Sequence, residues 1–259
     1  MCLTEETVET LYLLGEDQRI VGVSGYAVRP PRVRREKPRI SSFISADLPK
    51  ILALEPDLAL TFSDLQADIV RDLVKAGVAV HAFNHRDVDG IYGMVQTVGG
   101  LVGTAEKATA LAEELAAGVE RIRGLGTALP CRPRVYFEEW DEPMICGIRW
   151  VSELIEIAGG EDVFSEKARS PGARGRIVSV DEVATASPDL IIGSWCGKKF
   201  VPGRVTSRPG LEEVAAVQNK AVHEIKSALI LQPGPAALTD GLSELHRLIS
   251  EEAFRAATR

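Results

Sequence analysis

The sequence has few aromatic residues, few cysteines and no long apolar run, and each shortage excludes a class of protein. Only 5% of the 259 residues are Phe, Trp or Tyr. No run approaches the ~18 consecutive apolar residues that a membrane-spanning helix needs. Neither a zinc knuckle nor a redox pair is indicated, because the cysteines are widely spaced and form no CxxC motif. They are Cys2, Cys131, Cys146 and Cys196, and we expect free thiols.

Negative charge predominates, which argues against a nucleic-acid-binding surface. The formal net charge is -7, with 45% hydrophobic and 26% charged residues. Such a chain is soluble and globular, and it can bury one large core or two smaller ones. One basic run interrupts the acidic balance, and we interpret it first as a solvated loop and second as an anion contact. It consists of Arg29, Arg32, Arg34, Arg35, Lys37 and Arg39.

The start of the chain carries two opposing signals about location. No basic segment followed by an apolar one precedes Thr4, so the chain as written is expected to stay in the cytoplasm. Residues 1–3 nevertheless look like the tail of a strand whose beginning is absent. A leader upstream of Met1 therefore stays open as an alternative.

Residues 104–124 predict a long amphipathic helix that Thr104 caps and Gly124 ends. Apolar residues recur there every three or four positions, which is the period of one helix face. At ~1.5 Å per residue, about 20 residues span about 30 Å, the width of a small domain. Taken alone, the stretch favours one more helix of a single α/β domain. The apolar positions are Ala108, Leu111, Leu115, Val119 and Ile122.

Helices and strands alternate on both sides of this helix. Before it we expect helices beginning at Thr4, Ala46, Gln66 and Asp87 or Asp89, and strands over 19–24, 58–62 and 78–82. After it we expect strands over 134–137, 190–193 and 221–225, and helices over 150–158, 180–186, 211–216 and 236–253. Residues 26–40 are expected to form an irregular loop, because three prolines remove hydrogen-bond donors there. Alternation of this kind predicts an α/β fold with mainly parallel strands.

An internal repeat favours two similar lobes over one. LPKILALEPDLALTFSD and VDEVATASPDLIIGSWC each run from a helix through Pro-Asp-Leu into an apolar strand that an aromatic residue follows. One copy lies on each side of the long helix. We therefore predict two Rossmann-like lobes with mainly parallel sheets, joined by a single long α-helix, with a ligand cleft between the lobes. The predicted boundaries are 1–102 for the first lobe, 103–125 for the helix and 126–259 for the second lobe.

Aromatic and polar residues follow several predicted strands, where ligands bind in open parallel sheets. Tyr26 and Phe62 could equally be core residues, and Trp150 is expected in the core. Trp140 and Trp195 are expected to be exposed to a ligand. With flat apolar faces and a few polar groups, this set is typical of a small-molecule site.

No catalytic or metal-binding motif is complete. The neighbours Glu138 and Glu139 point to opposite faces of a strand, which disfavours a catalytic pair. His81 and His85 lack a third ligand and a helix to hold them, so an ordinary loop is favoured over a metal site. GSWCGKK has the wrong glycine spacing for a phosphate loop, and GVSGY is not a nucleophile elbow. We expect no enzyme activity.

Five stretches in order resemble the substrate-binding proteins of ABC importers for cobalamin, ferric siderophores and haem. They are VETLYLLGEDQRIVGVSGYAVRPP, ISADLPKILALEPDLALTF, RPRVYFEEWDEPMICGIRWVSELIEIAGGEDVF, VDEVATASPDLIIGSW and SRPGLEEVAAVQNKAVHEI. FEEWDEPM looks most like cobalamin-binding members. The resemblance implies two lobes on one rigid helix, with a bulky metal chelate between them and only a small hinge motion.

The resemblance also implies roles for individual residues. The implied ligand-contacting residues are Tyr26, Phe43, Phe62 and Trp195. Glu139 and Trp140 join the predicted contacts because they stand at the carboxyl end of the strand that begins at residue 134. Acidic residues on the rim of each lobe would meet arginines of the importer, and the matching positions are Asp64 or Asp68 and Glu212 or Glu213. The match is looser in the first lobe.

Cobalamin or a related corrinoid is the expected ligand, because a large and nearly neutral molecule suits aromatic walls with scattered hydrogen bonds. A trianionic ferric siderophore would call for an inward cluster of arginines, whereas this sequence concentrates arginine only over residues 29–39. A siderophore is therefore the second expected ligand and haem the third. A cytoplasmic carrier or sensor without an importer is the alternative from another class. The protein is expected to be a monomer without a cofactor or metal of its own.

Overall fold

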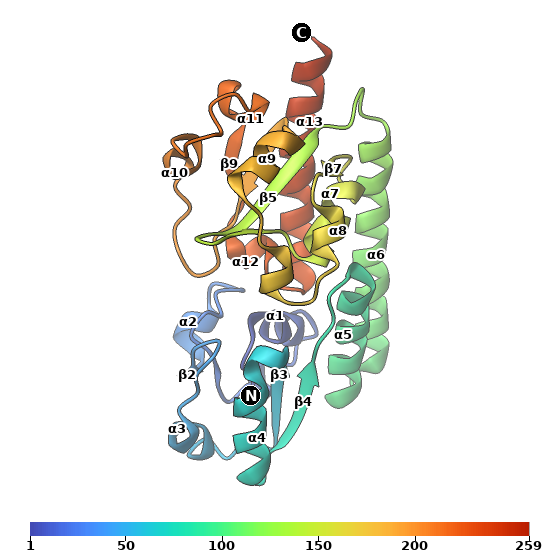
Figure 1. The fold of residues 1–259 in the computed structure, drawn as a ribbon. Coiled ribbons are helices and arrows are strands. Elements are labelled where there is room, and N and C mark those ends of the chain that lie inside the picture. Colours follow the sequence, from blue (N-terminus) through green and yellow to red (C-terminus); the bar gives the residue numbers. More distant parts are fainter. Residues whose placement is uncertain (259) are drawn as a thin grey trace. The chain divides into compact units, whose positions relative to one another are not determined.

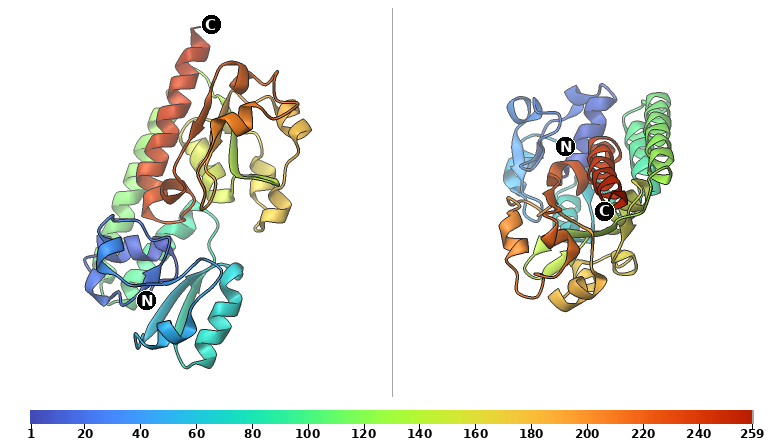
Figure 2. Two further views of the ribbon diagram at one scale, coloured as in Figure 1. Left: turned by 90° about the vertical axis from the view of Figure 1, so that its left-hand side faces the viewer. Right: turned by 90° about the horizontal axis from the view of Figure 1, so that it is seen from above.

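A computed structural model of the chain describes residues 1–258, which divide into two compact units. The first consists of residues 1–85 and 89–115, and the second of residues 86–88 and 116–258. The division falls inside one helix, α6 (Ala105–Thr127), which stays uninterrupted in every view (Figures 1 and 2). The two units are described in turn.

The first unit is a parallel sheet with helices between its strands. Its helices are α1 (Glu5–Leu13), α2 (Val33–Glu36), α3 (Leu48–Leu52), α4 (Ala67–Lys75) and α5 (Val88–Leu101), with 3₁₀ turns η1 (Asp17–Arg19) and η2 (Asp64–Gln66). Its strands are β1 (Val23–Ser24), β2 (Arg39–Ser41), β3 (Leu58–Phe62) and β4 (Ala79–Phe83). β1 pairs with β2, and β3 pairs with β4 from Leu58 opposite Ala79 to Phe62 opposite Phe83 (Figure 1).

The first three residues complete this sheet by lying between β1 and β3. Cys2 forms parallel bridges to both Val23 and Leu60. Its amide donates to the carbonyl of Gly22 at 2.9 Å, and the amide of Leu3 donates to the carbonyl of Leu60 at 2.9 Å. The segment has apolar neighbours on both sides, and Leu3 is fully buried. It behaves as a central strand, as its sequence suggests.

The second unit is a mixed sheet in the order β6-β5-β8-β9, with β7 also paired to β5. Its strands are β5 (Arg134–Asp141), β6 (Met144–Cys146), β7 (Glu161–Asp162), β8 (Leu190–Gly193) and β9 (Val222–Glu224). Only β6 runs antiparallel to its neighbour. The helices are α7 (Arg149–Ile157), α8 (Ser165–Ala168), α9 (Val180–Ala186), α10 (Pro202–Thr206), α11 (Ala215–Gln218), α12 (Ser227–Ile230) and α13 (Leu242–Ala257), with a 3₁₀ turn η3 (Ala173–Arg176) and a π-helical turn η4 (Ala237–Gly241).

The Pro-Asp repeat of the sequence has the same backbone in both copies. Glu55 and Ser187, the residues before the two prolines, have φ of 46° and 41°. Ser187 caps α9 in the left-handed conformation, whereas Glu55 lies three residues beyond the end of α3 at Leu52; from each the chain enters β8 or β3 through Pro-Asp. The repeat in the sequence is therefore a repeat in structure.

Three local predictions were wrong. The loop expected over 26–40 contains α2 and β2, because its prolines fall just outside those short elements. The strand expected over 19–24 is regular only from Val23, since η1 includes Arg19. The helix expected near 211–216 begins later, since residues 211–214 are not helical and α11 starts at Ala215. Each error concerns a short element. Such an element contains too few residues for a hydrophobic period to show its type or its ends.

The long helix α6 matches its predicted face but extends further than predicted. Four of the five predicted positions, Ala108, Leu115, Val119 and Ile122, are buried at 9% exposure or less, and the fifth, Leu111, is half-buried. Gly124 was expected to end the helix, yet α6 continues to Thr127. A glycine inside a helix costs only about 1 kcal/mol relative to alanine, which packing readily offsets.

Glycines bring α6 close to its neighbour in each unit. In the first unit, a Cβ on Gly99 would lie 2.1 Å from the Cβ of Ala108 in α6. In the second, a Cβ on Gly126 would lie 2.7 Å from the carbonyl oxygen of Ile157 and 2.8 Å from the amide nitrogen of Gly159. These spacings are too short for any added side chain. The backbone of α5 therefore lies against Ala108 of α6 in the first unit, and the backbone of α6 lies against that of residues 157–159 in the second.

Replacing Gly126 with alanine is expected to lower the free energy of unfolding by about 1–3 kcal/mol, because the new methyl group meets rigid backbone. Gly118→Ala in the same helix is the matched control. A Cβ there has no neighbour within 4 Å, and the change is expected to raise stability by up to about 1 kcal/mol. Urea unfolding of both variants is the measurement, and equal effects would contradict the close contact.

Candidate functional site

Three predicted contact residues lie near the carboxyl ends of strands in the first unit. Tyr26 follows β1 and is 49% exposed, whereas Phe62 ends β3 and is only 6% exposed. Phe43 follows β2 and is half-buried. The ring of His85 contacts that of Phe62 edge-on, with centroids 5.2 Å apart. Tyr26 and Phe43 are thus the rings that this unit offers to solvent, and Phe62 lies beneath the surface.

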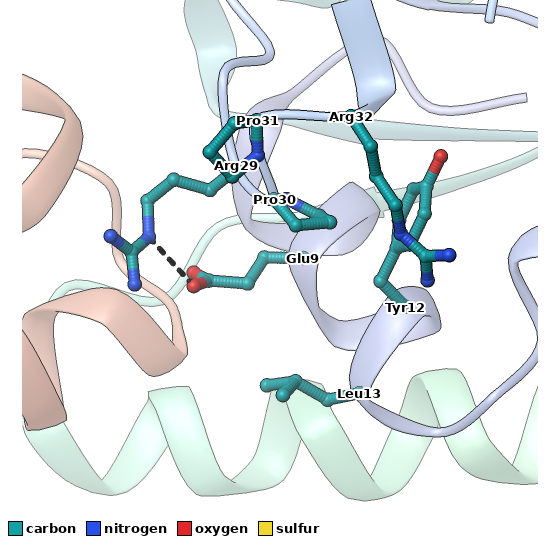
Figure 3. Close-up of a pocket in the computed structure, with 7 residues that line it drawn as sticks. All are labelled: Glu9, Tyr12, Leu13, Arg29, Pro30, Pro31 and Arg32. Atoms are coloured by element: carbon teal, nitrogen blue, oxygen red, sulfur yellow. Dashed lines mark hydrogen bonds and ion pairs between the residues drawn. The ribbon is translucent and has the colours of Figure 1, made fainter. Parts of the chain in front are cut away.

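A pocket of about 350 Å³ opens beside α1 in the first unit. Figure 3 shows Arg29 reaching Glu9 on one side of it and Arg32 lying along the ring of Tyr12 on the other. Arg29 Nε lies 2.8 Å from Glu9 Oε1, and the Arg32 guanidinium carbon lies 4.8 Å from the Tyr12 ring centroid. The remaining lining residues are Leu13, Pro30 and Pro31. Part of the basic run therefore borders a mostly apolar hollow.

Two glutamates at the start of α1 are buried, which the sequence did not indicate. Glu5 is 7% exposed and Glu6 is 1% exposed. Ser24 Oγ donates to Glu5 Oε1 at 3.3 Å and accepts from the amide of Tyr26 at 3.2 Å. Among residues 1–258, Glu5 Oε2 and Glu6 Oε1 have no hydrogen-bond partner. Burial, with a smaller contribution from the charge of Glu5, raises the pKa of Glu6 to about 8.

A fully buried carboxylate organises the strand ends of the second unit. Glu138 in β5 accepts hydrogen bonds from Tyr136 Oη at 3.0 Å and from Trp195 Nε1 at 3.0 Å. Arg208 adds two more, at 2.6 and 3.0 Å, in a two-pronged ion pair. Burial by itself lowers the pKa of Arg208, but the hydrogen bonds and charge of Glu138 outweigh it and raise that pKa.

Two further carboxylates at the same end of β5 form ion pairs. Glu139 pairs with both terminal nitrogens of Arg176, at 2.5 and 3.0 Å. Asp141 pairs with Lys198 and, at 3.2 Å, with Arg204. These two cations outweigh the effect of burial and lower the pKa of Asp141. As expected for adjacent strand residues, Glu138 and Glu139 bind different arginines.

The two tryptophans predicted to be exposed have different surroundings. Trp140 is half-buried, its indole N–H donates to the carbonyl of Glu142 at 2.9 Å, and Lys198 Nζ lies 4.0 Å from its ring centroid. Trp195 is only 2% exposed, so the prediction of its exposure was wrong. Its indole is held by Glu138 and packs edge-on against Phe200, with centroids 4.8 Å apart. Trp150 is buried, as predicted.

The four acidic residues with a predicted role in docking are all exposed. Asp68 pairs with Arg71 at 2.5 Å and retains 85% side-chain exposure. Glu212 accepts from the amide of Gly210 at 2.8 Å, and Glu213 accepts from Gln218 Nε2 at 3.0 Å. Asp64 begins η2 directly after β3. Their exposure is compatible with contact to another protein, and the docking role stays a prediction.

The two histidines considered for metal binding lie on and after β4. The ring of His81 lies 4.4 Å from that of Phe83, centroid to centroid. Across residues 1–258, no three His, Cys, Asp or Glu side chains lie close enough together to hold a metal ion. Within the same residues, no helix is both long and apolar enough to cross a membrane.

Comparison with known proteins decides the family. Residues 1–229 match the family model described as "Periplasmic binding protein". The chain belongs to the periplasmic binding protein family. Because the match covers most of the chain, it confirms the predicted resemblance and the α/β fold of parallel sheets with a long helix.

Two sequence relatives and one solved structure show which ligand-binding proteins this chain is similar to. It is 24% identical over 201 residues to the cobalamin-binding protein of Halobacterium salinarum, covering 73% of this chain but only about half, 52%, of that relative. It is 24% identical over 243 residues to the vitamin B12-binding protein of Vibrio cholerae, covering 91% of this chain and 83% of that protein. The periplasmic heme-binding protein RhuT of Roseiflexus sp. RS-1 has the same fold, with a TM-score of 0.84, 20% identity and 97% coverage of both chains.

Proposed function

We propose that this periplasmic binding protein is a non-catalytic substrate-binding protein that captures a bulky metal chelate, most favourably cobalamin or a related corrinoid, for delivery to an ABC importer. The observation that carries the proposal is the relationship to vitamin B12-binding protein across 91% of the chain. The composition of the strand ends supports it: exposed or half-exposed rings at Tyr26, Phe43 and Trp140, each beside a few fixed polar groups.

The roles of the six predicted contact residues follow from their exposure. Tyr26, Phe43 and Trp140 would contact the chelate directly, because their rings are partly open to solvent. Glu139 would contribute a polar contact whose direction Arg176 fixes. Phe62 and Trp195 would support the contact surface from beneath. A corrinoid fits these sites because broad apolar faces bind flat rings without a requirement for charge.

Haem is the second candidate, and two observations favour it. The structural neighbour RhuT is a heme-binding protein that matches 97% of the chain. Lys198 and Arg204 also share one carboxylate partner, Asp141, beside Trp140, so one of these cations could turn to an acidic ligand. A ferric siderophore is the third candidate.

The proposal also includes export of the protein from the cytoplasm and docking to the importer. Delivery to an importer places the protein outside the cytoplasm, in line with the family to which it belongs. We infer that the exposed Asp64 or Asp68 in the first unit, and Glu212 or Glu213 in the second, meet basic residues of the importer.

Titration with cyanocobalamin, haemin and a ferric hydroxamate, followed by tryptophan fluorescence, tests the function and ranks the ligands. We expect saturable quenching that is tightest for cyanocobalamin. Trp140→Ala and Tyr26→Ala are each expected to weaken binding about tenfold or more, since an aromatic contact contributes roughly 1 kcal/mol beyond its buried area. Leu125→Ala, at a position exposed on α6, is the control. Unchanged affinity in both aromatic variants would contradict the contact assignment.

A further inference from the structure

Gln66 is a fully buried amide that ties together three separate segments of the first unit. Its exposure is 0%. Its Oε1 accepts from the amide of Phe62 at 3.0 Å, and its Nε2 donates to the carbonyls of Leu3 at 3.2 Å and Phe43 at 2.8 Å. A single side chain thus joins the central segment, the end of β3 and the loop after β2.

The geometry requires an amide at this position. The Phe62 amide can only donate, and the two carbonyls can only accept. A carboxylate would face two carbonyl oxygens with negative charge, and an apolar side chain would leave three backbone groups buried without partners. Ser63, directly after β3, has φ of 67°, in the left-handed region that is rare for residues other than glycine. The backbone therefore adopts an unfavourable conformation at Ser63, three residues before Gln66.

The loop that Gln66 holds is closed on itself. The amide of Ser42 donates to the carbonyl of Ser45 at 2.8 Å, and the two serine hydroxyls lie 2.7 Å apart. Between them lie the half-buried Phe43 and Ile44, whose side chain is 70% exposed. Because the serines fix the shape of the loop, its attachment through the Phe43 carbonyl decides where these two apolar side chains lie.

We propose that Gln66 is a positioning residue for ligand binding: it fastens the 42–45 loop to the end of β3 and so places Phe43 for contact with the chelate. The role in binding rests on the proposed function. Gln66 itself does not contact the ligand, since its side chain is enclosed by protein. The backbone N–H of Phe62 donates to the oxygen of the same side-chain amide. The positions of two predicted contact residues, Phe43 and Phe62, therefore both depend on Gln66.

Hydrogen exchange of a Gln66→Met variant tests the anchoring half of the proposal, that Gln66 fastens the 42–45 loop to the end of β3. The change keeps the length of the side chain and removes its three hydrogen bonds. Amide exchange over residues 42–46 is expected to speed up about tenfold or more, while exchange in β8 and α9 of the other unit is unchanged. Gln18→Met, at an exposed position bonded only to Asp17, is the matched control. Unaltered exchange over 42–46 overturns the proposal.

A double-mutant cycle with Phe43→Ala tests the binding half, with cyanocobalamin and haemin as probes. Gln66→Met is expected to weaken binding about tenfold in the wild-type background and hardly at all when Phe43 is already alanine. Equal losses in both backgrounds overturn the positioning role, because general loosening would act without Phe43. If Gln66→Met does not fold, Gln66→Asn, which retains the amide on a shorter side chain, is subject to the same cycle.

The cycle separates this inference from the function on which it rests. If the wild-type protein binds the probes and the cycle is additive, only the positioning role fails. If the wild-type protein binds neither probe nor a ferric hydroxamate, the proposed function fails and the binding half of this inference fails with it. Faster exchange over 42–46 in Gln66→Met would then still support the anchoring half.

Discussion

Arg208→Ala is expected to lower the free energy of unfolding by about 3–5 kcal/mol, the range found when one partner of a buried ion pair is removed. Glu138 has 0% side-chain exposure and Arg208 has 15%. Without the guanidinium, the carboxylate stays buried with only the Tyr136 and Trp195 hydrogen bonds to compensate its charge. Urea or guanidinium unfolding followed by far-UV circular dichroism is the measurement.

Two companion variants separate charge from packing. Glu138→Gln combined with Arg208→Met removes both charges while retaining most of the volume, and it should recover much of the lost stability. Arg169→Ala is the exposed control. Its partner Glu166 is 79% exposed, so the change should cost well under about 1 kcal/mol. An Arg208→Ala variant as stable as Arg169→Ala would show that the Glu138 pair contributes little.

Stability should fall as pH rises from about 4.5 to about 8, and Glu6 should cause much of that fall. The folded protein holds the Glu6 proton more tightly than the unfolded chain, because burial raises its pKa from 4.5 to about 8. The stabilising effect is therefore complete below pH 4.5 and is lost as pH passes through about 8. Each unit of pKa shift corresponds to about 1.4 kcal/mol, so the full change is on the order of 5 kcal/mol.

Glu6→Gln isolates this effect, because the amide has the same shape and does not titrate. We expect the variant to show a much flatter dependence of unfolding free energy on pH between 5 and 8, measured by urea unfolding at each pH. Glu106→Gln, at an exposed position of α6, should behave like the wild type. Parallel pH curves for the wild type and Glu6→Gln would show that Glu6 ionises normally in the folded protein.

Periodic and local signals in the sequence predicted most of the regular structure. The buried face of α6, the strands β3 and β8 and the helix α9 follow from apolar spacing together with proline and glycine punctuation. The Pro-Asp repeat was informative because a proline after a left-handed residue determines the local backbone in both copies. Such features depend on residues within a few positions of each other.

The surroundings of the candidate site residues were harder to predict, because their partners lie far away in the sequence. Trp195 is covered because Glu138, 57 residues earlier, holds its indole. Glu5 and Glu6 look like ordinary charges at a helix start, yet both are buried, and Glu5 meets Ser24, 19 residues later in the chain. The three bonds of Gln66 reach across up to 63 residues. No local pattern marks contacts of this range.

Equilibrium dialysis of the purified protein against cyanocobalamin, haemin and a ferric hydroxamate tests the central claim most directly. We expect one of these chelates to be retained at one molecule per chain, with cyanocobalamin retained most tightly, and Trp140→Ala to lower its retention. Retention of none of the three at concentrations well above that of the protein would contradict the assignment as a chelate-binding protein.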